Sequence, residues 1–352
     1  MRILFFLCKF ANVTINLKET IAYMIHVALP TDSNAHLLTF YLAMEEYVAR
    51  HLDETEDYFF MWQVEPTVIF GRNQLIQSEV NLDYCRKHSI KTFRRKSGGG
   101  CVYADRNNIM FSYITHDDNV SLTFTKYIGM VVDMLRKLGV DATASGRNDI
   151  MIGDRKVSGN AFYHIPGHSI VHGTMLYDTD MQNMVGAITP SDEKLVSKGI
   201  SSVRQHITLL KDHISLGIED FKTFVVKELC DKEVTLDGGA IEEIGKIEEE
   251  YLSPHFIYGN NPRYNITRQG RIEGVGDFVV SMEMKNETIR DIDIKGDFFL
   301  VGDIGKALIT PLKGTRLNAD CLQRALPQRL DDIIMGLNKE DFIALLIKEQ
   351  HY

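Results

Sequence analysis

Hydrophobic and polar residues follow both helical and strand periods in the first half of this 352-residue chain. Apolar residues at helical spacing predict helices over residues 35–51 and 121–138, the first capped by Asn34. Short runs rich in β-branched and aromatic residues predict strands over 58–62, 67–70, 91–95 and 109–114. Because helices and strands are interspersed, this part of the chain favours a mixed α/β fold.

In the second half of the chain, the predicted elements change from strands to helices and then to a hairpin with terminal helices. Short apolar runs between polar turns predict strands over 150–152, 156–157, 161–164 and 170–177. Residues 221–251 are expected to be mostly helical. A glycine-punctuated pattern over 270–294 then predicts a hairpin, and two terminal helices follow, the last capped by Asn338. The final 90 residues or so therefore form a smaller α+β unit.

Proline, glycine and asparagine cluster over residues 253–265 and mark a domain boundary. We expect a larger domain over 24–252, a linker over 253–262 and a smaller domain over 263–352. Residues 1–23 are an extension of unknown role, with Met24 as an alternative functional start. Their apolar run is cut by Lys9 and is shorter than a secretory core.

Composition narrows the classes of protein. The 39 Lys and Arg against 48 Asp and Glu give a net charge of -9, which argues against a general nucleic-acid binder. No apolar run approaches the ~20 residues that span a bilayer. The five cysteines are far apart and form no CxxC pair, so neither a disulfide framework nor structural zinc is expected. A reducing cytoplasm fits this pattern best.

The strongest local feature is the segment over residues 94–103, which reads RRKSGGGCVY. Three consecutive glycines are costly in backbone entropy, but they let a ligand approach the main chain closely. Backbone N–H groups in such a loop form a nest for an anion, and the three preceding cations add positive charge. Two interpretations stay open: an anion site, which the cations favour, and a flexible hairpin tip with a solvated basic flank.

A second polar cluster surrounds Lys156, between polar turns and an expected strand. A lysine beside a phosphoryl group supplies a point charge that stabilises developing negative charge. Asp149 is a candidate Mg²⁺ ligand and equally a turn cap, since Mg²⁺ binds through one or two carboxylates plus substrate phosphates. His168 and His172 lack a third ligand for zinc, and no GxSxG supports a serine hydrolase.

These motifs, in this order and spacing, resemble those of the lipoate–protein ligase family. The glycine loop with Asp105 and Asn108, the segment 146–159 with Lys156, and the strand beginning His172-Gly173-Thr174 look like its signatures. Further matching blocks are Trp62, residues 71–72, 197–204, and 261–265 with 296–299. The resemblance covers about residues 24–345. It departs at Cys101, Ala104 and Asn160, where alanine, histidine and serine are usual, and the departures at Ala104 and Asn160 bear on the adenine and lipoyl contacts.

The resemblance implies a biotin/lipoate ligase-like catalytic domain, with mixed β-sheets flanked by helices, and a smaller accessory domain. It implies that lipoate and Mg-ATP form lipoyl-AMP, whose acyl group passes to a lysine of an acceptor. The acceptors are apo lipoyl domains of 2-oxoacid dehydrogenases or the H protein of glycine cleavage. A monomeric enzyme is expected, whose accessory domain rotates between the two half-reactions, and residues 148–162 are expected to order with ligand.

The same resemblance assigns roles to individual residues. Lys156 is the catalytic residue. Asp149 stays the candidate metal ligand on the residue chemistry alone, beside its interpretation as a turn cap. The nucleotide contacts are Arg95, Gly100, Cys101, Val102, Tyr103 and Lys156. The lipoate contacts are Trp62, Arg95, Ser97, Gly98, Gly99, Asn108, Lys156 and His172. From the residues themselves, Trp62 fits an apolar tunnel wall and plain core about equally.

Two rival functions stay open. An octanoyl or lipoyl transferase of the same fold would use a cysteine thioester and no ATP, and Cys101 is the cysteine near the motifs. A non-catalytic lipoate-binding protein would be expected to lack Lys156, which is present.

Overall fold

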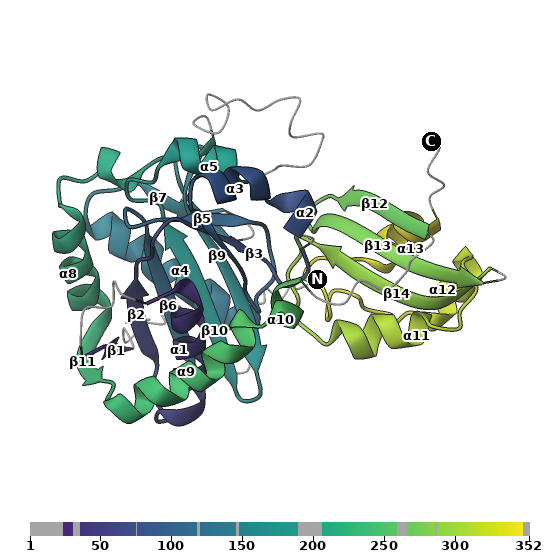
Figure 1. Ribbon diagram of the computed structural model, residues 1–352, viewed down its shortest axis with the longest axis horizontal. Coiled ribbons are helices and arrows are strands. Elements are labelled where there is room, and N and C mark those ends of the chain that lie inside the picture. Colours follow the sequence, from purple (N-terminus) through teal and green to yellow (C-terminus); the bar gives the residue numbers. More distant parts are fainter. Residues whose placement is uncertain are drawn as a thin grey trace, which may run out of the picture.

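The computed structural model describes residues 24–30, 36–74, 76–117, 120–145, 148–188, 206–258, 266–285 and 287–347. The expectations for residues 1–23, Asn34, 197–204 and 261–265 lie outside these residues. The described chain forms a larger unit up to Tyr258 and a smaller one from Ile266, which lie side by side in Figure 1.

An eight-stranded mixed sheet forms the frame of the larger unit. Its strand order is β11-β1-β2-β6-β10-β9-β8-β7. β1 pairs in parallel with both β11 and β2, and the other neighbours are antiparallel. The strands are β1 (Met24–Ala28), β2 (Tyr58–Trp62), β6 (Ile109–Thr115), β7 (Ala142–Ala144), β8 (Asp149–Ile152), β9 (Arg155–Ile165), β10 (His168–Met175) and β11 (Cys230–Thr235).

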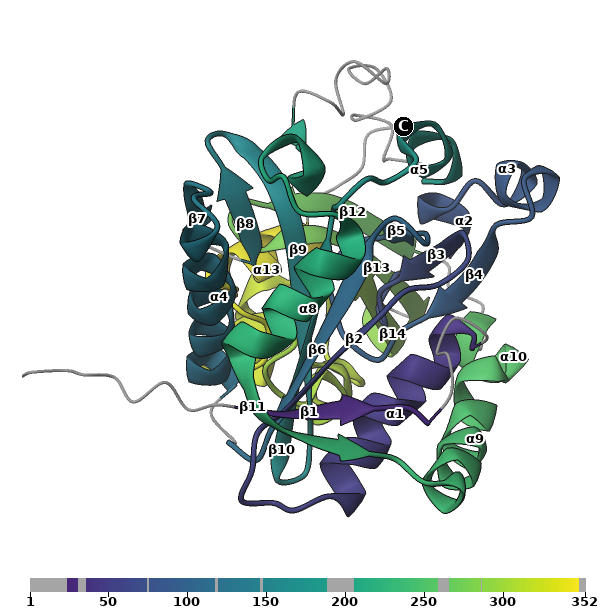
Figure 2. The same cartoon turned by 90° about the vertical axis from the view of Figure 1, so that its left-hand side faces the viewer.

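Helices cover both faces of this sheet (Figure 2). α1 (Leu38–His51) packs with α9 (Gly238–Leu252) on one face, and α4 (Val120–Lys137) packs with α8 (Ile218–Leu229) on the other. Alternation along β2 explains the division, because Tyr58 and Phe60 join the core on the α1 side and Phe59 joins the core on the α4 side. The buried aromatic strands therefore serve two cores at once.

A three-stranded sheet with the order β4-β3-β5 flanks the main sheet and carries the glycine loop between β4 and β5. β3 pairs in parallel with β4 and antiparallel with β5. Its strands are β3 (Thr67–Phe70), β4 (Lys91–Arg94) and β5 (Val102–Ala104). Short helices surround it: α2 (Ile76–Glu79), α3 (Leu82–Lys87), α5 (Met181–Ala187) and α10 (Pro254–Tyr258).

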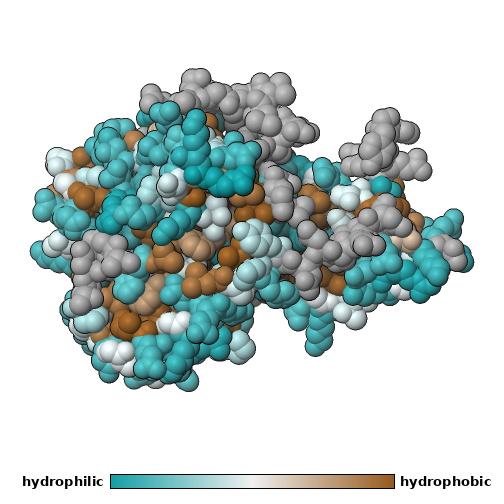
Figure 3. All heavy atoms as spheres, viewed as in Figure 1, coloured by the Kyte–Doolittle hydropathy of each residue, from teal (hydrophilic) through white to brown (hydrophobic). Residues whose placement is uncertain are grey.

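The smaller unit is an antiparallel meander packed against short helices. β12 (Ile266–Ile272), β13 (Gly276–Lys285) and β14 (Thr288–Gly296) form the sheet. A π-helical turn (Gly305–Ile309) leads into α11 (Thr310–Leu312), followed by α12 (Ala319–Ala325) and α13 (Lys339–Ile347). Their apolar side chains form a separate core, and hydrophilic side chains cover most of the unit's visible face in Figure 3.

Several elements differ from the sequence-based expectations. β9 is one continuous strand over Arg155–Ile165, because pairing with β10 runs through the polar residues expected to be a turn. Residues 148–162, expected to order with ligand, therefore belong to a paired β-hairpin. The polar strand β11 divides the expected helical segment 221–251 because it pairs with β1 and forms the edge of the main sheet.

The ends of two elements also differ. α1 begins at Leu38 rather than residue 35, and α10 occupies part of the expected linker. The expected cap of the last helix is confirmed, because Oδ1 of Asn338 accepts a hydrogen bond from the backbone N–H of Asp341 at 2.8 Å. In the residues that the structure describes, no helix has the length and apolar character needed to cross a membrane.

Candidate active site

A cavity opens where the main sheet, the glycine loop and the smaller unit meet. The cavity is open on one side, and the empty space within it, including open solvent at its mouth, is about 590 Å³. Polar groups line one part and apolar side chains the rest, as is usual for sites that bind small organic ligands. Its lining includes Leu42, Trp62, Ile69, Arg95, Gly99, Gly100, Cys101, Val102, Met110, Asn148, Lys156, Gly159, Asn160, Ala161, His172, Gly173, Thr174 and Phe299.

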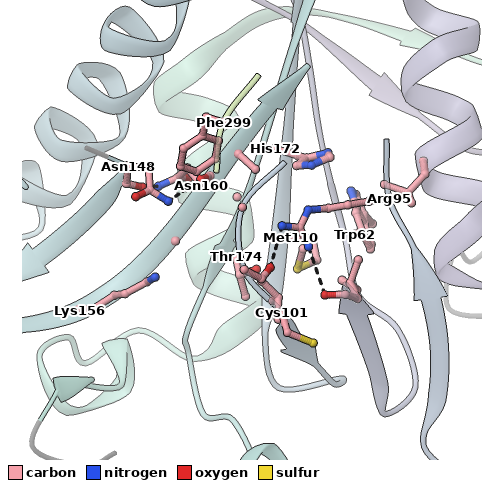
Figure 4. Close-up of a pocket in the computed structure, with 18 residues that line it drawn as sticks. Trp62, Arg95, Cys101, Met110, Asn148, Lys156, Asn160, His172, Thr174 and Phe299 are labelled. Carbon is pink, nitrogen blue, oxygen red and sulfur yellow. Dashed lines mark hydrogen bonds between the residues drawn. The ribbon is translucent and has the colours of Figure 1, made fainter. Parts of the chain in front are cut away.

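Lys156 reaches the cavity from β9. Figure 4 shows its side chain on one side of the cavity, with Arg95 and Trp62 on the opposite side. Its Nζ atom lies 2.8 Å from Oδ1 of Asp149 on β8, and about a third of the side chain is exposed. A side chain on Gly159 would place Cβ 2.7 Å from the Lys156 Nζ, so glycine leaves the space that the ammonium group occupies. The lysine is thus held by an ion pair at the cavity wall.

Arg95 is buried behind the glycine loop. Its Nε donates to Oγ of Ser97 at 2.8 Å, and its Nη2 donates to the carbonyls of Gly98 and Gly100 at 2.6 and 2.7 Å. Nη1 donates to the carbonyl of Ile69 at 3.1 Å. Burial lowers the pKa of Arg95 to about 10, so the guanidinium stays protonated at neutral pH. Three of its five N–H groups hold the loop and a fourth bonds β3, and the expected phosphate contact of Arg95 stays a prediction.

The fold itself requires the first two glycines of the triple, Gly98 and Gly99. Gly99 has φ +84°, a conformation that favours glycine, and its N–H donates to the carbonyl of Phe298 at 3.1 Å. A Cβ at Gly98 would lie 2.4 Å from that same carbonyl oxygen. The loop therefore lies directly against the backbone of the smaller unit.

Four of the expected contact residues are not brought to the cavity wall. Ser97 is fully buried behind the loop, and Gly98 faces Phe298. Tyr103 packs in the α1-side core, and Asn108 donates from Nδ2 to Oγ1 of Thr179 at 2.7 Å. Strand alternation explains Tyr103, because its neighbour Val102 faces the cavity instead.

Trp62 combines both roles expected for it. It lines the cavity, yet only 2% of it is exposed. Its ring stacks on Tyr41 at a centroid distance of 5.0 Å, and its Nε1 donates to Oγ of Ser112 at 2.9 Å. The indole is therefore a fixed part of the cavity wall.

Cys101 lines the cavity, but its surroundings do not activate the thiol. Burial raises the pKa of Cys101 well above its usual range, and the nearby Arg95 only partly offsets this effect. The thiolate is the nucleophilic form of cysteine. At neutral pH the Cys101 thiol is protonated, which argues against a thioester mechanism at this position.

Asp149 is the carboxylate expected to bind Mg²⁺, and its side chain pairs with Lys156. Within the described part of the chain, no group of three or more His, Cys, Asp or Glu side chains is arranged to hold a metal ion. One carboxylate fits a Mg²⁺ ion that arrives with a nucleotide, whose other ligands are phosphate oxygens and water. It does not fit a dedicated metal cage.

The structure adds cavity residues that were not assigned as contacts from the sequence. On β9 and β10 they are Gly159, Asn160, Ala161, Gly173 and Thr174, and elsewhere Leu42, Ile69, Met110 and Asn148. Strand periodicity was a usable signal, since Thr174 lies two residues from His172 and shares its face. Phe299 had no such signal, because it comes from the smaller unit. Its ring stacks on Phe162 at 5.7 Å.

These features define a two-unit α/β enzyme. It has a mixed sheet with helices on both faces, a cavity that carries a lysine, and a small C-terminal unit. The family model for the lipoyl protein ligase A/B catalytic domain matches residues 38–230, and that for the bacterial lipoate protein ligase C-terminus matches 261–346. The lipoate-protein ligase LplJ of Bacillus subtilis is 33% identical over 322 residues, 87% of this chain and 95% of the relative. The chain belongs to the lipoate–protein ligase family.

Solved structures support the fold. LipL1 of P. falciparum, in complex with lipoate, matches with a TM-score of 0.70 at 20% identity, covering 92% of this chain and 98% of that one. A bipartite lipoate protein ligase of Thermoplasma acidophilum, studied with its E2 lipoyl domain, matches with a TM-score of 0.61 at 25% identity. It covers 69% of this chain and 99% of the archaeal one. The expected fold class is confirmed.

Proposed function

We propose that this chain is an ATP-dependent lipoate–protein ligase that works in two steps. First, a lipoate carboxylate oxygen attacks the α-phosphorus of ATP, forming lipoyl-AMP and displacing pyrophosphate. Second, the amine of an acceptor lysine attacks the acyl carbon of lipoyl-AMP, forming an amide and releasing AMP and a proton. Membership of the family supports this activity, as does the name of the Bacillus subtilis relative.

The observation that carries the proposal is the position of Lys156 in the cavity, across from an apolar wall. The first step concentrates negative charge on the α-phosphate and needs little covalent help from the protein. An ammonium group at that point stabilises the charge as it develops. Lys156 leaves Asp149 for the phosphate when substrate binds, and the apolar wall around Trp62 receives the lipoyl chain.

The backbone of Gly99, Gly100 and Cys101 is proposed to lie along the nucleotide. Asp149, released by Lys156, would hold Mg²⁺ together with phosphate oxygens, and the ion would neutralise phosphate charge. The ring of His172 and the indole of Trp62 are placed to contact the lipoyl part.

The proposed acceptors are apo lipoyl domains of 2-oxoacid dehydrogenases or the glycine cleavage H protein. The pairing of the Thermoplasma acidophilum ligase with an E2 lipoyl domain supports this class of partner. We also propose a cytoplasmic reaction. The cysteines in the described residues, Cys85, Cys101, Cys230 and Cys321, are free thiols, as expected in a reducing compartment.

The direct test combines purified protein, an apo lipoyl domain, Mg-ATP and lipoate, followed by mass spectrometry of the acceptor. The proposal expects a mass gain equal to one lipoyl group, dependent on ATP, with pyrophosphate released even without acceptor. Modification from an acyl thioester donor without ATP would instead identify a transferase. Lipoate binding without pyrophosphate release would identify a non-catalytic binding protein.

A further inference from the structure

A chain of hydrogen bonds runs through the protein behind the cavity. Trp62 Nε1 donates to Ser112 Oγ at 2.9 Å, and Ser112 Oγ donates to Glu45 Oε1 at 2.6 Å. On the other side, His172 Nδ1 lies 3.0 Å from Glu45 Oε2, and His172 Nε2 lies 2.7 Å from Ser97 Oγ. Arg95 Nε completes the chain with its bond to Ser97 Oγ. The members in order are Trp62, Ser112, Glu45, His172, Ser97 and Arg95.

The donors fix where each proton lies. The carboxylate of Glu45 only accepts, so Nδ1 of His172 carries a proton and donates to it. In the neutral imidazole, Nε2 is then an acceptor, and the Ser97 hydroxyl donates to it while its oxygen accepts from Arg95 Nε. The carboxylate of Glu45, which is fully buried, accepts at both oxygens. This assignment satisfies every member of the chain.

The Glu45, His172 and Ser97 sequence has the order of a catalytic triad but not its function. Ser97 is fully buried and is not on the cavity wall, and its oxygen already accepts from Arg95. A nucleophile must reach the substrate. The hydroxyl here joins two side chains that do line the cavity, His172 and Arg95.

We propose that Glu45 is a positioning residue for lipoate activation, an inference that rests on the proposed function. Glu45 fixes the His172 tautomer, the tautomer fixes the Ser97 hydroxyl, and Ser97 holds the guanidinium that bonds the carbonyls of Gly98 and Gly100. In the other direction, Ser112 holds the indole of Trp62. One buried carboxylate thus orients both the glycine loop and the apolar wall.

Glu46 offers a matched control on the same helix. It is also buried, at 2% exposure, but bonds Lys96 Nζ at 2.7 Å and Arg50 Nη2 at 3.1 Å. Its Oε1 also accepts from the Tyr251 hydroxyl, and Lys96, Arg50 and Tyr251 are not among the residues that line the cavity. Glu46→Gln therefore makes the same chemical change one residue away without touching the chain of hydrogen bonds.

The test compares Glu45→Gln with Glu46→Gln. Glutamine replaces one carboxylate oxygen with an NH2 group, which donates, so either the Nδ1–H of His172 or the hydroxyl of Ser112 then faces a donor instead of an acceptor. We expect Glu45→Gln to lower kcat for lipoate-dependent pyrophosphate release by about 10- to 100-fold, as misplacement of reacting groups by about 1 Å does. kcat/KM should fall by the same factor, whereas Glu46→Gln should leave both unchanged.

Two spectroscopic measurements are independent of activity. Nitrogen NMR of His172 should show a protonated Nδ1 in the unmodified protein and in Glu46→Gln, and a changed tautomer mixture in Glu45→Gln. Trp62 is the only tryptophan, so its fluorescence should shift in Glu45→Gln as its bond to Ser112 changes. If the unmodified protein releases no pyrophosphate, the proposed function fails. The two spectra still test whether the hydrogen bonds of Glu45 orient His172 and Trp62.

Ser97→Ala covers the case in which Glu45→Gln does not fold. It leaves the Glu45–His172 bond in place and removes the link to Arg95, so it should also lower kcat. A normal kcat in Ser97→Ala would overturn the proposal. So would equal kcat values and equal His172 spectra in Glu45→Gln and Glu46→Gln. Either result would leave the ligase activity established.

Discussion

At the scale of single residues, the proposed chemistry rests on Lys156. Its ammonium pairs with Asp149 at the wall of the cavity, and we propose that it leaves this carboxylate when a phosphate competes for it. Lys156 lies on the long strand β9, which extends the short strand that the sequence predicted over residues 156–157. A strand fixes the backbone on both sides of the lysine, so only the side chain has to move.

We expect Lys156→Ala to lower the rate of pyrophosphate release by about 10²- to 10³-fold, the usual effect of removing one group that stabilises transition-state charge. The side chain is partly exposed, so the melting temperature should change little. A matched control is Lys232→Ala, which breaks an exposed ion pair with Glu56 of the same 2.8 Å length, away from the cavity. Near-normal pyrophosphate release by Lys156→Ala would show that another group supplies the charge.

Cys101 separates the ligase from a transferase. Because burial raises the pKa of its thiol, the reactive thiolate is scarce at neutral pH. Cys101→Ala should therefore keep ATP-dependent ligation. In the unmodified protein, iodoacetamide at pH 7 should label Cys101 more slowly than it labels an unburied thiol, as followed by peptide mass spectrometry. Loss of acyl transfer in Cys101→Ala with ATP-independent activity in the parent protein would support the thioester route.

At the scale of elements, most of the fold follows from hydrophobic period. β2 and β3 begin and end at the predicted residues, and α4 differs by one residue at each end. Hydrophobic periodicity gave the wrong element where pairing between strands overrides the local composition. β11 is polar along most of its length and becomes a strand through its pairing with β1, a contact between residues about 200 positions apart.

The candidate site shows the same limit. The glycine loop and Lys156 are local motifs, so the sequence alone pointed to them. Ser97, Tyr103 and Asn108 belong to those motifs and yet face the protein interior, because only three-dimensional packing decides which side of a motif meets the ligand. Phe299 could not be placed in the cavity from the sequence, since nothing local links it to β9.

The β8–β9 hairpin allows a comparison of two glycines. Gly159→Ala should displace the Lys156 ammonium, because the new Cβ would lie 2.7 Å from Nζ, and lower kcat with little change in stability. Gly153 lies at the hairpin turn with φ +61° and open space around it. Gly153→Ala should instead cost about 1 kcal/mol of unfolding free energy, the cost of a left-handed conformation, and leave kcat unchanged. Thermal melts and pyrophosphate release together distinguish the two effects, and equal profiles would refute the role given to Gly159.

At the scale of the whole molecule, the smaller unit takes part in the site. Phe299 lines the cavity, the Phe298 carbonyl accepts from Gly99 N–H, and Gly296 N–H donates to the Asn73 carbonyl at 2.7 Å. The Gly99 N–H cannot serve a phosphate while it bonds Phe298. Closing the loop on a nucleotide therefore requires the smaller unit to withdraw, which gives a physical reason for the domain rotation that we predict.

Small-angle X-ray scattering tests this rotation. The profile of the protein should change when ATP and lipoate form the adenylate, because the unit that carries Phe298 and Phe299 moves relative to the main sheet. The protein with lipoate alone is the control, since no nucleotide is then present to draw the loop away from Phe298, and it should keep the starting profile. Phe299→Ala removes the ring that stacks on Phe162, so this variant should reach the moved profile at lower substrate concentration. If ATP and lipoate leave the profiles of both proteins unchanged, the loop accepts a nucleotide beneath a fixed smaller unit, and the Gly99–Phe298 bond persists through the reaction.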